Sequence, residues 1–155
     1  MYHKEVGTIK MLPSFSMMLG FTKSLSLEFE AAHVINADLS WITVNSLKPG
    51  RTNDYTLMIH SSAEYAKAHI NNDHLEVMDN LIQETSRIIG HDVSDATFKI
   101  IHGWRYANNL NREDSSVFLD HINGLAACGD WCFGGRVEGA FTSACSLVKA
   151  IKEYL

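Results

Sequence analysis

The segment from Gly124 to Ala140 combines glycines, a carboxylate and the start of a helix at a spacing suited to ligand binding. An apolar strand, Gly124 to Cys128, runs into Gly129-Asp130-Trp131, and Gly134-Gly135 then precede a helix that opens at Arg136. Glycines permit close backbone approach, and free amides at a helix N-terminus favour a negative group such as a phosphate or a reduced flavin. Asp130, just past the strand's carboxyl end, is placed to accept hydrogen bonds from a polyol chain. The pattern predicts a strand-loop-helix that contacts an anionic or polyol-bearing ligand such as a flavin, and an ordinary β-loop-α joint explains the same glycines equally well.

A second glycine pattern, the one that usually holds a dinucleotide, is missing. Dinucleotide-binding proteins hold the pyrophosphate on a Gly-x-Gly-x-x-Gly turn, and no two glycines of this chain are separated by a single residue. The sequence therefore predicts one half of a nucleotide site.

A run of aromatic and apolar residues with a period of two supplies a candidate substrate surface. Phe98, Ile100, His102, Trp104 and Tyr106 share one face of a predicted strand. Aromatic walls suit a planar, nicotinamide-like ring, and a packed core strand explains the same pattern equally well.

The predicted strand Trp41 to Leu47 leaves the same two readings open. Trp41 and Asn45 share one of its faces. Arg105 points away from the aromatic face of its own strand, which favours a structural hydrogen bond or ion pair.

Histidines and cysteines give no metal-site pattern. The eight histidines contain no His-Glu-x-x-His, and Cys128 and Cys132 lack a second ligand pair. Cys145 falls within the last predicted helix, where we expect a buried, inert thiol. Three cysteines cannot all pair, and no secretory segment precedes them, so a reducing cytoplasm is expected.

Composition narrows the class of protein. The 155 residues are 46% hydrophobic, enough for one domain with a core or for part of a larger protein. A net charge of -5 with 13 Lys and Arg argues against nucleic acid as a partner. No apolar run approaches the roughly 20 residues of a membrane span, so a soluble protein is expected.

The remaining pattern predicts α+β structure. Strands are expected at Ser14 to Phe21, Leu25 to Val34, Trp41 to Leu47 and Tyr55 to His60, with a type II turn at Lys48-Pro49-Gly50-Arg51. Capping boxes at Ser61 and Asp73 open helices that end near Ile70 and at Gly90. After a polar loop from Asn108 to Ser116, two short strands, Ser116 to His121 and Asn123 to Cys128, precede a helix from Gly135 to Tyr154. Its expected apolar stripe is Val137, Ala140, Phe141, Ala144, Val148 and Ile151.

Three motifs in order resemble a known family. Gly134-Gly135-Arg136-Val137-Glu138-Gly139-Ala140 is similar to the closing FAD motif of the flavin-containing amine oxidase superfamily, particularly its renalase-like branch. Trp104-Arg105-Tyr106-Ala107 and the turn Asn45 to Arg51 resemble further motifs of that branch. The resemblance implies a mostly antiparallel substrate-domain sheet at 13–107 after a lead-in at 1–12, and a β-loop-α piece of an incomplete FAD-binding, Rossmann-like domain at 108–155.

The resemblance also implies roles for individual residues. FAD would contact Gly129, Asp130, Gly135, Arg136, Val137 and Glu138, with Asp130 on the ribityl chain and the amides near Val137 and Glu138 at the pyrimidine edge. Candidate substrate contacts are Asn45, His102, Trp104 and Tyr106. The implied reaction is hydride transfer from an amine-like or dihydronicotinamide-like substrate to the flavin. A solvated charge pair on the first helical turn is the alternative for Arg136 and Glu138.

Because the resemblance covers only the C-terminal half of a flavoprotein, three functional hypotheses stay open. The chain is a truncated FAD-dependent oxidoreductase that is inactive alone, half of a split enzyme completed by a separate Rossmann chain, or a non-enzymatic interaction module. Lack of the Rossmann half would expose the sheet edge at Asn123 to Cys128 and part of the helix stripe. We therefore expect a homo-oligomer.

Overall fold

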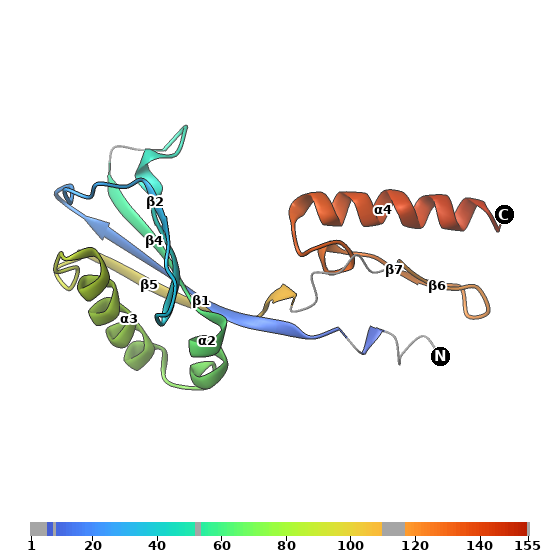
Figure 1. Ribbon diagram of the computed structural model, residues 1–155, viewed down its shortest axis with the longest axis horizontal. Coiled ribbons are helices and arrows are strands. Elements are labelled where there is room, and N and C mark those ends of the chain that lie inside the picture. The colour runs from blue at the N-terminus through green and yellow to red at the C-terminus, as the bar shows by residue number, and fades with distance from the viewer. Residues whose placement is uncertain (1–5, 8, 52–53, 110–116, 155) are drawn as a thin grey trace. The chain divides into compact units, whose positions relative to one another are not determined.

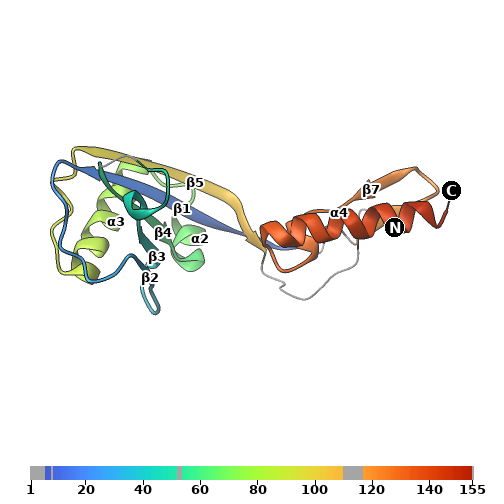
Figure 2. The same ribbon diagram turned by 90° about the horizontal axis from the view of Figure 1, so that it is seen from above.

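The computed structural model describes residues 6–7, 9–51, 54–109 and 117–154 of the chain. The chain divides into two compact units: Pro13–Arg105, and Met1–Leu12 together with Tyr106–Leu155 (Figures 1 and 2). The first, here the sheet unit, carries a five-stranded sheet and two helices. The second, the C-terminal unit, carries a two-stranded hairpin and the long last helix.

The five-stranded sheet has the order β2-β3-β4-β1-β5. Strand β4 pairs antiparallel with β1 on one side, where Met18 is opposite Met58, and with β3 on the other, where Ile42 is opposite Ile59. The strands are β1 (Met11–Phe21), β2 (Ala31–His33), β3 (Leu39–Val44), β4 (Tyr55–Ser61) and β5 (Phe98–Asn109).

Helices α2 (Ala63–His69) and α3 (His74–Ile89) cover one face of this sheet (Figure 1). Alternate residues of the strands point to that face because side chains of a strand alternate between its two sides. These strand residues form a fully buried core with Ala66, Val77 and Leu81 of the helices. The strand residues of the core include Phe15, Met17, Leu19, Ile42, Leu57 and Ile59. The opposite face carries no helix among the described residues of the unit, and large side chains on it remain exposed.

Local signals in the sequence account for the ends of both helices. Asp73 caps α3 by accepting hydrogen bonds from the amides of Leu75 and Glu76, and Gly90 ends it in the left-handed conformation at φ 69°. The cap of α2 is Ser62, not Ser61 as expected: its side chain accepts from the Tyr65 amide. The Ser61 hydroxyl instead accepts from the Phe15 amide of β1.

The C-terminal unit is a β-loop-α arrangement. Strands β6 (Phe118–Asp120) and β7 (Leu125–Ala127) form an antiparallel hairpin, and the 3-10 turn η2 (Asp130–Cys132) leads to helix α4 (Val137–Lys152). The inward residues of α4 are Gly139 and Ser143, whereas Val137, Phe141 and Val148 of the expected stripe are 89%, 73% and 51% exposed. Cys145 is also exposed, so the expectation of a buried thiol was wrong.

The expected α+β class is confirmed, and two of the predicted strands are shorter than expected. Residues 22–30 are irregular, and β2 keeps only three of the ten residues predicted as a strand. The strand predicted to Leu47 ends at Val44, and Asn45–Leu47 form the 3-10 turn η1. The type II turn that follows is confirmed by a bond from the Arg51 amide to the Lys48 carbonyl (3.4 Å) and by φ 74° at Gly50. Residues 110–116 of the expected polar loop lie outside the described part of the chain.

Candidate functional site

The loop between η2 and α4 is closed around one main-chain oxygen. The Asp130 carbonyl accepts hydrogen bonds from the amides of Phe133 (3.0 Å) and Gly135 (2.9 Å), and the Cys132 amide donates to the Gly129 carbonyl (3.1 Å). Gly134 and Gly135 have φ values of 74° and 69°, which residues with side chains rarely adopt. The Gly-Gly pair is therefore required by the turn that delivers the chain to α4.

Helix α4 begins without a side-chain cap. Arg136 is the N-cap residue and its side chain makes no capping bond, whereas its carbonyl accepts a hydrogen bond from the Ala140 amide (3.1 Å). The amides of Val137 and Glu138 belong to the first turn, which has no partner within its own helix. Both residues are exposed. A helix start of this kind offers main-chain donors to an anionic or strongly polar group.

Close packing fixes this helix start against the loop. A Cβ at Gly139 would overlap the carbonyl oxygen of Phe133, and a Cβ at Gly129 would overlap the indole of Trp131. Asn109, at the end of β5, holds the same loop by donating from Nδ2 to the Trp131 carbonyl (2.8 Å), and the rings of Phe118 and Trp131 pack with centroids 5.4 Å apart. Cys132 is fully buried beneath the loop, and burial raises the pKa of its thiol.

The C-terminal unit thus gathers all the residues expected at the cofactor. Gly129, Asp130, Gly135, Arg136, Val137 and Glu138 occupy one loop and the first turn of α4, and Asp130 is half-buried at the start of η2. Asn109 was not singled out by the sequence, because the chain around it was expected to be an irregular loop. The one feature of the sequence that could have pointed to Asn109 is a polar amide side chain directly after the alternating pattern of β5.

The open face of the five-stranded sheet carries a row of polar and aromatic side chains that crosses all five strands. Register pairs join His33 to Trp41, Trp41 to His60, and His60 to Ser16. Trp104 completes the series on β5 by donating its indole Nε1–H to Ser16 Oγ (3.1 Å). We name these five residues, His33, Trp41, His60, Ser16 and Trp104, the cross-sheet row.

Hydrogen bonds link the inner members of the cross-sheet row. Ser16 Oγ lies 3.0 Å from His60 Nδ1, and the Trp41 indole donates to Thr43 Oγ1. Burial is the larger cause that lowers the pKa of His60, and the positive charge of Lys48 is the smaller one. Both favour the neutral imidazole ring. Ser16 is buried at 8% exposure, whereas Trp41 and Trp104 are 40% and 52% exposed.

Three of the four expected substrate contacts lie on β5, and Asn45 does not share their strand. His102 and Trp104 lie together on β5, with ring centroids 4.3 Å apart, and Tyr106 is exposed further along the same strand. Asn45 lies in η1 beyond the end of β3, so it does not continue the strand face of Trp41. Arg105 donates to Asn71 Oδ1 (2.9 Å), the structural hydrogen bond expected for it.

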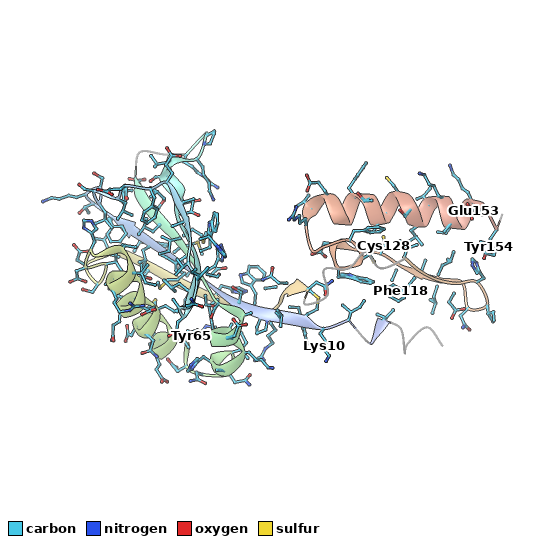
Figure 3. The ribbon with its side chains drawn as sticks, in the orientation of Figure 1. Lys10, Tyr65, Phe118, Cys128, Glu153 and Tyr154 are labelled. Atoms are coloured by element: carbon cyan, nitrogen blue, oxygen red, sulfur yellow. The ribbon has the colours of Figure 1, made fainter. Side chains whose placement is uncertain are left out.

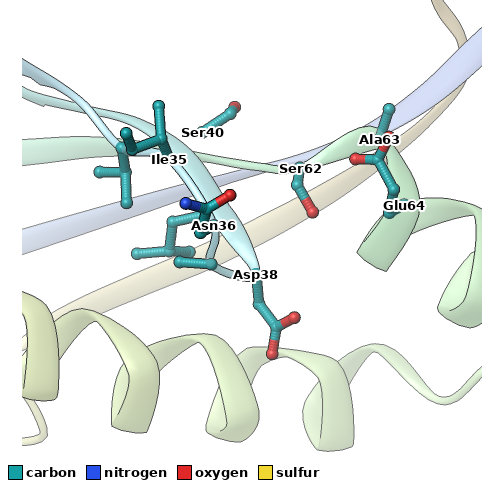
Figure 4. A pocket seen from close by; sticks show the side chains of 10 residues that line it. Ile35, Asn36, Asp38, Ser40, Ser62, Ala63 and Glu64 are labelled. Carbon is teal, nitrogen blue, oxygen red and sulfur yellow. The ribbon is translucent and has the colours of Figure 1, made fainter.

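Two hollows lie away from these residues. One of about 670 Å³ sits between the β2–β3 connection and the start of α2, lined among others by Asn36, Asp38, Ser62 and Glu64 (Figure 4). Another of about 360 Å³ lies beside the β6–β7 hairpin and the end of α4. Tyr154, labelled in Figure 3, lines it, and its ring lies against that of His121 with centroids 3.5 Å apart. Neither hollow contains a residue predicted to bind cofactor or substrate.

The described ranges contain neither a metal-binding cluster nor a membrane-spanning helix. Within them, no three His, Cys, Asp or Glu side chains come together as they would around a metal ion. No helix of those ranges has the length and apolar character needed to cross a membrane.

Comparison with known proteins gives a fold likeness. No family model matches the sequence. The structure is similar to the crystal structure of a putative protoporphyrinogen oxidase from Exiguobacterium sp. 255-15, with a TM-score of 0.71 and 11% sequence identity. The match covers 98% of this chain and 37% of the other, so the chain spans little more than a third of that protein's length. At this identity the likeness concerns the fold.

Proposed function

We propose that this chain carries the flavin-ring contacts and the ligand-binding sheet of an FAD-dependent oxidoreductase of the renalase-like, amine oxidase type. The observation that carries the proposal is the uncapped start of α4, held by the loop that closes around the Asp130 carbonyl. The fold likeness to a protein described as an oxidase is consistent with it.

The residues present fit a flavin ring at this position. Glycine at 139 lets the helix approach the Phe133 carbonyl of the loop more closely than any side chain would permit, and glycine at 129 leaves room for the Trp131 indole within the loop. The amides of Val137 and Glu138 remain available as donors. When bound, FAD would supply hydride acceptance. The chain's own residues would orient it: Asp130 would accept hydrogen bonds from the ribityl hydroxyls, and the α4 amides would donate to the pyrimidine edge. The dipole of α4 would favour negative charge there.

The contacts for pyrophosphate and adenosine belong to a glycine-rich half that this sequence does not contain. We therefore propose that FAD binds tightly only when that half is supplied, by the same protein or by a separate chain. Contacts divided between two parts lose much of their affinity when one part is absent.

A backbone substitution tests the role of α4 directly. Val137 is the first residue of the helix, where proline is tolerated but removes the amide hydrogen, and the extended Arg136 (φ −121°, ψ 162°) suits a following proline. V137P should weaken FAD binding by about tenfold, the loss of one hydrogen bond to a charged group. FAD fluorescence would be titrated with the chain combined with a glycine-rich N-terminal half of a relative.

V137A is the matched control, because it shortens the same side chain and keeps the amide. D130A should weaken binding to a similar extent through the ribityl contact. Equal FAD affinity for V137P and V137A would refute the assignment of the α4 start to the flavin.

A further inference from the structure

The cross-sheet row has a charge character that limits what can bind on it. Its ionisable members are the histidines His33 and His60, and His102 lies beside Trp104 on the same face. The cation of Lys48 acts on His60 and contributes to lowering its pKa, after burial. The five strands β1 to β5 contain no Asp or Glu on either face. An ammonium group would find no carboxylate on these strands, whereas an anion would meet donors.

The hydrogen bonds within the row determine which atoms are left for a ligand. An indole N–H only donates, so Ser16 Oγ accepts from Trp104. The hydroxyl hydrogen of Ser16 is then satisfied by His60 Nδ1, 3.0 Å away, if the imidazole carries its own hydrogen on Nε2. The Trp41 N–H is already used by Thr43. Both indoles therefore offer their rings, and His60 offers one polar donor, Nε2–H.

We propose that the cross-sheet row binds a planar aromatic ligand that carries a carboxylate, with His60 Nε2–H donating to the carboxylate and the Trp41 and Trp104 rings packing against the aromatic part. The occupant follows from charge complementarity: the row offers a neutral N–H donor at His60, on which the Lys48 cation acts, together with exposed aromatic rings and no acidic strand residue. Ser16 acts as a positioning residue, because its hydroxyl fixes both the Trp104 indole and the His60 tautomer. The inference rests on the proposed function in that it assigns a substrate class to the open sheet face.

Two probes that share a ring and differ in charge test the charge preference. The 155-residue chain would be titrated with naphthalene-2-carboxylate and with naphthalen-2-ylmethylammonium at pH 7, and the indole N–H signals of its three tryptophans followed by NMR. The carboxylate should shift the signals of Trp41 and Trp104 and bind at least fivefold more tightly than the ammonium. Trp131, in the C-terminal unit, is the internal control and should not shift. Absence of shifts at Trp41 and Trp104, or equal or tighter binding of the ammonium, would overturn the proposal.

Matched substitutions at His60 identify the donor. A glutamine amide nitrogen lies close to the place of Nε2, whereas an asparagine amide nitrogen lies closer to Nδ1. H60Q should therefore keep binding of the carboxylate probe within about twofold, and H60N should lose about tenfold, the loss of a hydrogen bond to a charged group. S16A should broaden or move the Trp104 signal before any ligand is added, since its acceptor is removed. Equal affinities for H60Q and H60N would show that Nε2–H is not the contact. None of these titrations involves flavin, so their failure is separable from that of the α4 site.

Discussion

At the scale of single residues, His60 links the stability of the sheet unit to pH. Burial and the Lys48 cation both lower its pKa from the ordinary value of 6.5. The folded protein therefore binds a proton at His60 less readily than the unfolded chain does. Between the lowered folded pKa and about 6.5, the unfolded state holds more protons, so the free energy of unfolding falls as pH falls through this window.

Removing the titrating ring should flatten this dependence. Urea unfolding followed by circular dichroism at several pH values from 5 to 8 should show the unsubstituted chain losing stability on acidification faster than H60Q and H60N. Neither glutamine nor asparagine at position 60 titrates, and H60N keeps a polar atom near Ser16, so agreement between the two variants would separate the charge effect from local packing. Parallel pH profiles for all three proteins would contradict a lowered His60 pKa.

At the scale of elements, the joint between the Gly129–Gly135 loop and α4 depends on the absence of a side chain at Gly139. Alanine normally stabilises a helix interior by about 1 kcal/mol relative to glycine. Here its Cβ would overlap the Phe133 carbonyl oxygen, which belongs to the backbone and cannot move independently of the loop. G139A should therefore destabilise the joint by about 1 to 3 kcal/mol, the usual penalty for overpacking.

The effect of G139A would be measured as the urea midpoint of the α4 amide signals in NMR spectra. T142A, at an exposed position on the same helix, is the control and should be neutral or slightly stabilising. A gain of stability in G139A equal to that in T142A would mean that loop and helix are not in close contact.

The same elements show how far the sequence could predict the structure. Asp73 and Gly90 delimit α3 as expected, because a cap and a left-handed terminus are encoded within four residues of each helix end. The 3-10 turn at Asn45–Leu47 could not be predicted, since the alternation of residues 41–47 is the same for a strand that continues and for one that stops.

Only one part of the candidate site could be predicted from the sequence. The glycines and Asp130 form a local motif in the sequence, whereas the cross-sheet row joins Ser16, His60 and Trp104 across up to 88 positions in sequence. Only strand order and register bring such residues together. A rule based on spacing along the chain has no access to them.

At the scale of the whole molecule, the outward face of α4 is the strongest candidate for association. Val137, Phe141 and Val148 recur at helical spacing and are 89%, 73% and 51% exposed, and Cys145 is exposed on the same helix. Exposed apolar side chains at helical spacing form a continuous stripe, and such stripes mark surfaces that bind another protein. Either the glycine-rich half of a flavoprotein or a second copy of this chain would bury it.

For the chain on its own, we predict a homo-oligomer that buries this stripe. Light scattering across a dilution series should give a mass above 17.3 kDa that falls toward the monomer value on dilution. F141D should shift the equilibrium to monomer, because a carboxylate cannot be buried against an apolar partner without a large loss of solvation. T142D, which adds the same charge at the neighbouring exposed position, should shift it less. A monomer at high concentration would refute the prediction, as would equal oligomerisation of the unsubstituted chain and F141D. Suppression of the oligomer by the glycine-rich half would show that both partners use the same face of α4.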